Sequence, residues 1–288
     1  MHFSIPDTEE FSDNGGSMYM ASIKPSRWNG TTIWTGYNIH INGTFHCSVR
    51  YRQLLSLHEQ LRKELGPSAA SNLPPFPPKR LLPLSPSQLE ERRAVLEKYI
   101  QTVSQDARVA SSELFMGFLL SAQVETSKEP SSPVTLDVYL MNDKRITVDI
   151  NATAPSHQVL MSVCQKLHLP PELLDYFALF LVRREVDGDI TVIKKLQNFE
   201  SPYISLKYME NPHRVVLRKG FWDTGLESAL LEDSVALNLL YTQAVADLEL
   251  GWMLADMETQ ELLTNLQVQG EKSEVSSKSS DIFSICKT

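Results

Sequence analysis

Cysteine is scarce in this chain of 288 residues, and the three cysteines that it has follow no known pattern. Cys47, Cys164 and Cys286 lie far apart, with no CxxC pair and no histidine at metal-ligating spacing. An odd number of isolated cysteines is typical of a reducing compartment and speaks against a disulfide framework or a zinc site. The sequence therefore predicts a cytoplasmic protein that binds no metal.

Long apolar runs and secretory signals are absent as well. No stretch approaches the roughly 18 consecutive apolar residues that indicate a membrane-spanning helix. The acidic start, MHFSIPDTEEFSDNGG, lacks the apolar core of a signal peptide. The net charge of −8 speaks against general nucleic-acid binding. We therefore expect no transmembrane segment and no nucleic-acid partner.

The sequence also contains none of the common catalytic motifs: GxSxG, a P-loop, GxGxxG or HExxH. His58 and Glu59 are followed by Arg62, where HExxH needs its second histidine. We expect His58 to pack on the inner side of a helix. The pair Glu90 and Glu91 fits a first helical turn, where the helix dipole favours negative charge. The sequence therefore predicts no catalytic residue, no cofactor and no enzymatic activity.

A basic segment is present, despite the acidic balance of the whole chain. Residues 37–108 contain ten Lys and Arg against six Asp and Glu. This asymmetry suits a domain that docks on an anionic membrane, where each nearby basic side chain contributes on the order of 1 kcal/mol. It is also compatible with a basic segment that contacts the acidic half of its own chain.

The first part of this basic segment predicts a hairpin followed by a helix. Strands are expected at residues 37–41 and 44–49, joined by the Asn42-Gly43 turn that two-residue hairpins favour. The run RYRQLLSLHEQLRKEL at residues 50–65 then predicts an amphipathic helix. Its apolar face carries Leu54, Leu55, Leu61 and Leu65.

The second part, PPFPPKRLLPLSPSQLEERR at residues 74–93, predicts a rigid proline segment and a second helix. The proline segment ends in Lys79 and Arg80. Ser85, a proline and Gln88 form a helix start with a capping box, and we expect that helix to run to about residue 103. A further helix at residues 112–122 would close the domain.

The order and spacing of RY, PPFPPK and ERR-xxxx-KY resemble the phox-homology (PX) domain of the sorting nexins over residues 37–123. The resemblance implies that Arg50 holds the 3-phosphate of phosphatidylinositol 3-phosphate and that Tyr51 stacks under the inositol ring. It also implies that Lys79 meets the 1-phosphate and Arg92 the ring hydroxyls. The residue types fit, because arginine binds phosphate through a planar fork and lysine acts as a point charge. The alternative is that these are ordinary surface cations.

Three stretches leave alternatives open. PPFPP is also a pattern that SH3-type modules bind. Leu81 and Leu82 can pack in the protein's own core or insert into a bilayer interface beside the basic residues. Residues 22–36, SIKPSRWNGTTIWTG, have no counterpart in the family, so this insertion either bulges out as a loop or damages the first strand.

A second fold begins after a linker rich in Ser, Glu and Pro. Strands are expected at residues 134–141, 146–150, 177–184 and 190–195, with a helix at 156–168, which is the order of a ubiquitin-like roll. Together with LLDYFALFLVR and KKLQNFESPYISL, this order resembles the first lobe of the FERM-like module of the sorting nexin 17 and sorting nexin 31 group. A helix at residues 233–252, with an apolar stripe expected in the core, would begin the second lobe.

We therefore expect an α+β protein with a PX domain, a ubiquitin-like roll and a partial helical FERM lobe. The expected boundaries are a disordered N-terminus at 1–17, the PX domain at 18–123 with its insertion at 22–36, a linker at 124–133, the ubiquitin-like lobe at 134–209, the partial helical lobe at 210–270 and a disordered tail at 271–288. The resemblance further implies truncation before a third lobe, which receives NPxY cargo tails in full-length relatives. Cargo binding is therefore not carried over.

The function that this resemblance implies is that of a peripheral adaptor on the cytosolic face of early endosomes. It would bind phosphatidylinositol 3-phosphate and serve intracellular protein transport and receptor recycling. The alternative is a soluble protein-interaction module with a non-functional lipid pocket.

Overall fold

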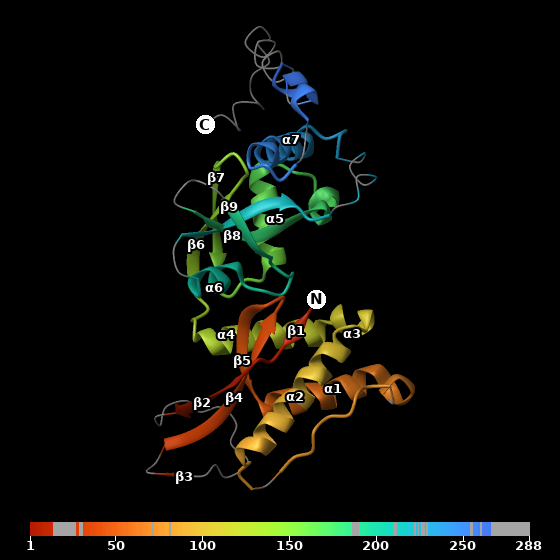
Figure 1. Ribbon diagram of the computed structural model, residues 1–288, viewed down its shortest axis with the longest axis vertical. Coiled ribbons are helices and arrows are strands. Elements are labelled where there is room, and N and C mark those ends of the chain that lie inside the picture. The colour runs from red at the N-terminus through yellow and green to blue at the C-terminus, as the bar shows by residue number, and fades with distance from the viewer. Residues whose placement is uncertain are drawn as a thin grey trace. The chain divides into compact units, whose positions relative to one another are not determined.

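The computed structural model describes the residues 1–13, 27–28, 31–70, 72–80, 82–185, 190–209, 212–221, 223, 225, 228, 230–253, 256–259 and 261–265. The chain divides into two compact units, Met1–Ser131 with Asn198–Ser205, and Ser132–Gln197 with Leu206–Thr288. Each unit contains one sheet and helices that pack against it (Figure 1). The predicted α+β class is confirmed.

The sheet of the first unit is organised around the long strand β4 (Thr31–Ile41). This strand pairs with four others, all antiparallel: β1 (Phe3–Ser4), β2 (Thr8–Asp13), β3 (Arg27–Trp28) and β5 (Thr44–Arg50). The predicted hairpin is confirmed in β4 and β5. Its turn residues Asn42 and Gly43 have φ values of 51° and 81°, and the two-residue type I′ turn requires positive φ at both positions.

The described part of the insertion lengthens the first hairpin strand. Residues Gly36–Ile41 of β4 pair with β5, while Thr32–Tyr37 pair with β2. The stretch TTIWTG is rich in the β-branched and aromatic residues that favour strands, and β2 supplies its backbone partners. At residues 31–36 the insertion is therefore neither a loop nor an interruption of the strand. Residues 22–26 and 29–30 lie outside the described part of the chain.

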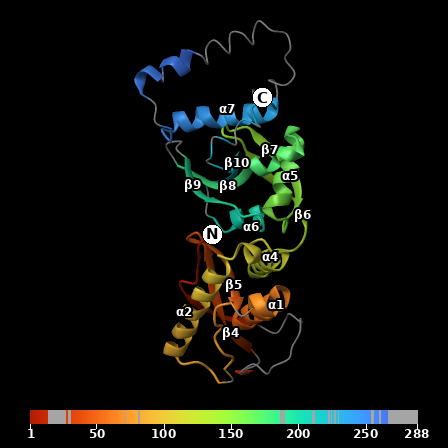
Figure 2. The same ribbon diagram turned by 90° about the vertical axis from the view of Figure 1, so that its right-hand side faces the viewer.

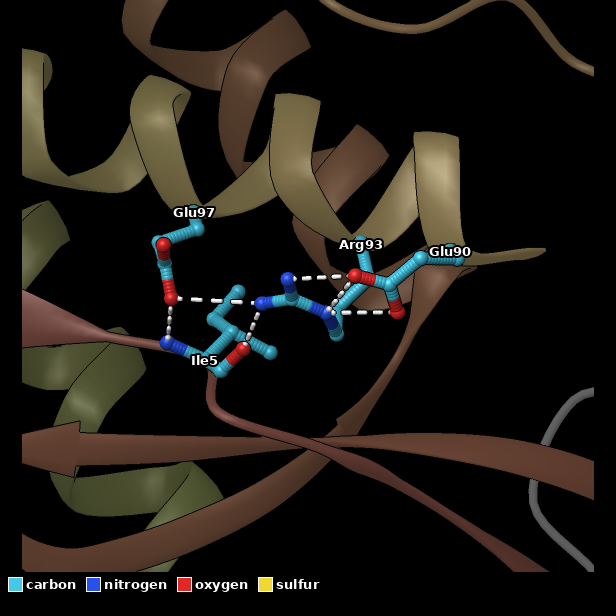
Figure 3. Close-up of polar contacts among 4 residues, drawn as sticks. All are labelled: Ile5, Glu90, Arg93 and Glu97. Carbon is cyan, nitrogen blue, oxygen red and sulfur yellow. Dashed lines mark hydrogen bonds and ion pairs between the residues drawn. The ribbon is translucent and has the colours of Figure 1, made fainter. Parts of the chain in front are cut away.

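The prediction of a disordered N-terminus is wrong for the residues that the structure describes there. Phe3 and Ile5 are 1% and 0% exposed. The backbone N–H of Ile5 donates to Glu97 Oε2 at 2.7 Å, and its carbonyl accepts from Arg93 Nη1 (Figure 3). The composition of this segment is polar, but Phe3 and Ile5 belong to the core of the first unit, and the Ile5 backbone is held by residues of α2. Residues 14–17 lie outside the described part.

The helices of the first unit are α1 (Tyr51–Ala70), α2 (Pro86–Val103), α3 (Ala107–Ala110) and α4 (Glu113–Ser127). The capping box of α2 is confirmed, with Ser85 as its N-cap. Two boundaries differ from the prediction. Helix α1 continues beyond a kink at Gly66, where a loop was expected, and α4 continues into the expected linker. Apolar side chains of α1, α2 and α4 pack against the sheet in one core.

The second unit contains β6 (Pro133–Tyr139), β7 (Arg145–Asn151), α5 (Ser156–Leu167), η1 (Pro171–Tyr176), β8 (Phe177–Arg184), β9 (Ile190–Lys195), β10 (His213–Lys219) and α7 (Ser234–Glu249). The sheet order is β7-β6-β10-β8-β9, with β10 parallel to β6 and antiparallel to β8 (Figure 2). Helix α5 packs on this sheet, which confirms the ubiquitin-like roll. Its expected end at residue 209 is wrong, because β10 lies between β6 and β8 in the same sheet. The segment Asn198–Ser205 belongs to the first unit and includes the beginning of α6 (Pro202–Lys207).

Helix α7 is present where it was expected, but only part of the predicted apolar stripe is shielded from solvent. Leu237 and Tyr241 are 44% and 54% exposed. The buried face instead carries Ala236, Gln243, Ala246 and Asp247. A buried ion pair, in which Asp247 Oδ1 lies 3.0 Å from Arg218 Nη2 of β10, fixes the rotation of the helix. An apolar stripe predicts that a helix is amphipathic, but the partner strand decides which residues it buries.

Candidate functional site

The predicted Arg50–Tyr51 pair lies where strand β5 ends and helix α1 begins. The side-chain oxygen of Gln53 accepts a hydrogen bond from the backbone N–H of Arg50 at 2.7 Å, which satisfies a donor at the start of the helix. The strand-to-helix change therefore fixes the backbone of both residues. The Arg50 guanidinium carbon lies 4.0 Å from the centroid of the Trp34 ring.

Tyr51 and Arg92 are in direct contact, although 41 positions separate them in the sequence. The Arg92 guanidinium carbon lies 4.4 Å from the centroid of the Tyr51 ring, a cation–π geometry. The Tyr51 hydroxyl donates to the Pro77 carbonyl at 2.8 Å, and Arg92 Nη2 donates to the Pro78 carbonyl at 3.2 Å. Tyr51 and Arg92 thus hold the proline segment through the carbonyl groups of two successive prolines.

Lys79 is placed by the same two hydrogen bonds, because it directly follows the held proline pair. Its side chain is exposed. The structure therefore brings Tyr51 and Arg92 into contact, with Arg50 next to Tyr51 in the chain and the backbone of Lys79 next to the held prolines. One arginine lies over the Tyr51 ring and the other over the Trp34 ring, next to a rigid proline wall. Such an arrangement suits a small polyanion with several phosphates.

Burial raises the pKa of Tyr37 and of Tyr51 above the usual value of 10.0, and the Arg92 guanidinium works against that rise in both. Both phenols therefore stay protonated and neutral near pH 7. No tyrosinate offsets the positive charge of the arginines. The local charge of the site is therefore set by its cations.

Arg93, the neighbour of Arg92, serves a different purpose. Its Nη2 lies 2.6 Å from Glu90 Oε1, and its Nη1 lies 3.4 Å from Glu97 Oε2 (Figure 3). The same Nη1 also donates to the carbonyl of Ile5. Of the two arginines in the ERR motif, Arg92 belongs to the candidate site and Arg93 fastens the N-terminal segment to α2.

The predicted membrane-insertion loop is described only in part. Leu81 lies outside the described residues. Leu82 is 80% exposed, so it is not buried in the core of the first unit. Its neighbours Lys79 and Arg80 are exposed as well.

Trp34 is the contact residue that sequence reasoning missed. No partner for it could be named from the sequence, because the ring meets Arg50 only when β4 pairs with β5. The sequence did offer one signal. Trp34 lies two residues before Gly36, in a strand that pairs with the strand that ends at the Arg-Tyr pair.

His58 is packed against aromatic side chains of the first unit. His58 Nδ1 lies 2.9 Å from the Tyr99 hydroxyl, and its ring stacks on Phe76 with centroids 4.9 Å apart, as expected for a packed histidine. Among the described residues, no group of three or more His, Cys, Asp or Glu side chains could hold a metal ion. Within the same residues, no helix is both long and apolar enough to cross a bilayer.

Three family models match consecutive stretches of the chain. The PX domain model matches residues 37–122, the model of the sorting nexin 17/27/31 FERM F1 lobe matches 134–222, and that of the sorting nexin 17/31 FERM F2 lobe matches 223–276. The chain is similar to human sorting nexin-17, at 46% identity over 276 residues, which cover 95% of this chain and 55% of the relative.

Two further relatives agree with this match. Sorting nexin-17 of Danio rerio is 45% identical over 95% of this chain and 54% of its own length. Human sorting nexin-31 is 39% identical over 88% of this chain and 53% of its own length. The chain thus spans about half the length of the curated relatives that it matches. A solved structure of a designed CISK-PX domain aligns with 41% of the chain at 27% identity and a TM-score of 0.30, too low to support an argument.

Proposed function

This chain belongs to the sorting nexin 17/31 family of non-enzymatic adaptors, and we propose that it binds phosphatidylinositol 3-phosphate through its PX domain. In this proposal it is a peripheral protein on the cytosolic face of early endosomes. It serves intracellular protein transport and receptor recycling there, with its FERM lobes making protein contacts.

The observation that carries the proposal is the contact of Arg92 with Tyr51, beside Arg50 and the held proline segment. The four predicted residues come from a strand end, a helix start, a proline segment and a second helix. Two of these residues, Tyr51 and Arg92, are in contact although they lie far apart in the sequence, which unrelated surface residues would not require. The arrangement therefore favours a phosphoinositide site over a set of unrelated surface residues.

Each side chain has a role in the proposal. Arg50 binds the 3-phosphate as a bidentate fork, and Lys79 meets the 1-phosphate as a point charge. Tyr51 supports the inositol ring, and Arg92 donates to the ring hydroxyls. Since Arg92 covers one part of the Tyr51 ring at 4.4 Å, the ligand must use the remaining surface of that ring.

In the same proposal, the exposed loop after the proline segment contacts the bilayer beside the bound headgroup. Leu82 would enter the interface while Lys79 and Arg80 remain at the level of the anionic headgroups. Binding to vesicles would then exceed binding to the soluble headgroup, because apolar burial adds to phosphate recognition.

Vesicle sedimentation with the full chain tests the proposal. Vesicles of phosphatidylcholine and phosphatidylserine are compared with and without phosphatidylinositol 3-phosphate, for the native chain and for Arg50→Gln. We expect binding that depends on the phosphoinositide and falls at least about tenfold in the variant. Binding that responds to neither the lipid nor the substitution would favour the alternative, a soluble interaction module with a non-functional lipid pocket.

A further inference from the structure

Trp34 lies between two other side chains on one face of the sheet of the first unit. The rings of Trp34 and Phe11 are stacked, with centroids 4.4 Å apart and planes at 14°. The Arg50 guanidinium lies 4.0 Å from the same Trp34 centroid. Phe11 is on β2 and Arg50 is on β5, and these strands flank β4 on its two sides. The two contacts therefore use opposite faces of the indole ring.

The strand register explains how Arg50 reaches this ring. Arg50 is paired with Gly36, two positions along β4 from Trp34, so Trp34 and Gly36 share a face. Diagonal neighbours of this kind lie within reach of aromatic and long side chains. Because Gly36 has no side chain, the residue opposite Arg50 adds no side chain of its own between Arg50 and the indole.

Gly36 is required for this arrangement. An added Cβ at this position would lie 2.5 Å from Cε2 of Phe11 and 2.2 Å from Oγ of Ser48. The close approach of Phe11 to the strand is therefore possible only with glycine. Within the described part of the chain, the indole N–H of Trp34 has no hydrogen-bond partner, so the ring is held through its two faces.

We propose that Trp34 is a positioning residue of the phosphate site: its ring, supported by Phe11, holds the Arg50 guanidinium in the orientation that binds the phosphoinositide. This inference rests on the proposed function of the PX domain. An indole contacts the face of a guanidinium, whereas a phosphate accepts from the N–H groups at its edge, so one arginine can make both contacts. Holding the guanidinium in place before binding reduces the side-chain freedom that binding must remove.

The inference also gives the insertion a function. Trp34 lies in residues 22–36, and β2, which carries Phe11, pairs with that extension of β4. The extension therefore contributes to phosphate recognition, in contrast to a neutral loop or a damaged strand.

The test compares Trp34→Phe with Trp34→Leu in the full chain. Both variants keep an apolar side chain in the sheet, but only phenylalanine keeps a π face for the guanidinium. Affinity for soluble short-chain phosphatidylinositol 3-phosphate is measured by calorimetry, with unphosphorylated phosphatidylinositol as the reference ligand. We expect Trp34→Phe to bind within about twofold of the native chain and Trp34→Leu about fivefold more weakly, with the loss confined to the phosphorylated lipid.

A matched control is available in the second unit, where the guanidinium carbon of Arg218 lies 4.8 Å from the centroid of Trp252. Trp252→Leu removes a tryptophan–arginine contact of the same kind and should leave the affinity unchanged. Thermal unfolding of all variants separates lost affinity from lost fold. Equal affinity of the two Trp34 variants, or tighter binding by Trp34→Leu, would overturn the inference.

The outcomes also separate this inference from the proposed function. Suppose that the native chain binds the phosphorylated lipid, that Arg50→Gln loses this binding, and that Trp34→Leu keeps it. In that case only the proposed role of Trp34 is wrong. If the native chain itself fails to prefer the phosphorylated lipid, the proposed function fails, and the role of Trp34 fails with it.

Discussion

His46 and Glu200 face each other inside the first unit, with Nδ1 3.5 Å from Oε1 and both side chains 0% exposed. The other ring nitrogen of His46, Nε2, lies 3.1 Å from the Leu119 carbonyl, to which it must donate. The pair joins Asn198–Ser205, a segment distant in sequence, to the strand that ends at the candidate site.

Removing one member of this pair should destabilise the first unit. Glu200→Ala leaves a buried histidine without its partner, which typically costs about 3 kcal/mol of unfolding free energy. A double-mutant cycle with His46→Ala, measured by denaturant unfolding, should give a coupling of at least about 1 kcal/mol. The exposed pair Arg183 and Glu185 is the control, with an expected coupling below about 1 kcal/mol. A buried coupling no larger than the exposed one would contradict the prediction.

The neighbours Arg92 and Arg93 should separate binding from stability. Arg93→Ala leaves the Ile5 carbonyl without its donor and should lower the unfolding free energy by about 1–2 kcal/mol, with faster hydrogen exchange near Phe3. Phosphoinositide affinity should change little. Arg92→Ala should do the reverse, with weaker binding and nearly native stability. If both variants lose affinity equally, the assignment of separate roles is incorrect.

His58 should make the first unit less stable in mild acid. Burial, together with the Arg62 charge, lowers the pKa of His58 below its ordinary value of 6.5. The unfolded chain then takes up a proton at a higher pH than the folded chain, so stability is complete above 6.5 and falls as the pH drops below that value. Thermal midpoints between about pH 5 and pH 7.5 should therefore fall more steeply for the native chain than for His58→Gln. Parallel curves would refute this prediction.

Gly36→Ala should be strongly unfavourable, because its Cβ would overlap Phe11 and Ser48. We expect a loss of about 1–3 kcal/mol of unfolding free energy, together with weaker phosphoinositide binding as the Phe11–Trp34 stack shifts. Gly117→Ala is the matched control, since nothing lies within 4 Å of the added Cβ and the residue is in helix α4. Alanine there should stabilise the helix by about 0.5–1 kcal/mol. Similar effects at both glycines would exclude the steric explanation.

Leu82→Glu should weaken vesicle binding but leave binding of the soluble headgroup unchanged. The side chain is 80% exposed, so the substitution places a charge where the proposal puts the bilayer interface, without disturbing the core. Sedimentation with vesicles and calorimetry with a short-chain lipid measure the two effects separately. Ser87→Glu, at another exposed position near the start of α2, adds the same charge as a control. An equal loss of vesicle binding in both variants would point to charge repulsion instead of insertion.

Local signals in the sequence determined those elements whose partners lie within a few residues. Asn42 and Gly43 specify their turn because both tolerate positive φ, and Ser85 with Gln88 specifies the start of α2 because each caps the other. The Arg-Tyr pair and the proline segment could be identified because their order and spacing resemble those of the PX domain. Their roles in binding remain predictions.

Only the tertiary structure decided which distant groups meet. The ordering of Phe3 and Ile5, the stack of Arg50 on Trp34 and the buried His46–Glu200 pair each depend on partners that strand register and helix packing bring together. The periodicity of α7 predicted an amphipathic helix, but the ion pair of Asp247 with Arg218 selected the face that is buried. A sequence pattern gives a side chain its local orientation, whereas burial and charge pairing depend on surfaces that exist only after the chain has folded.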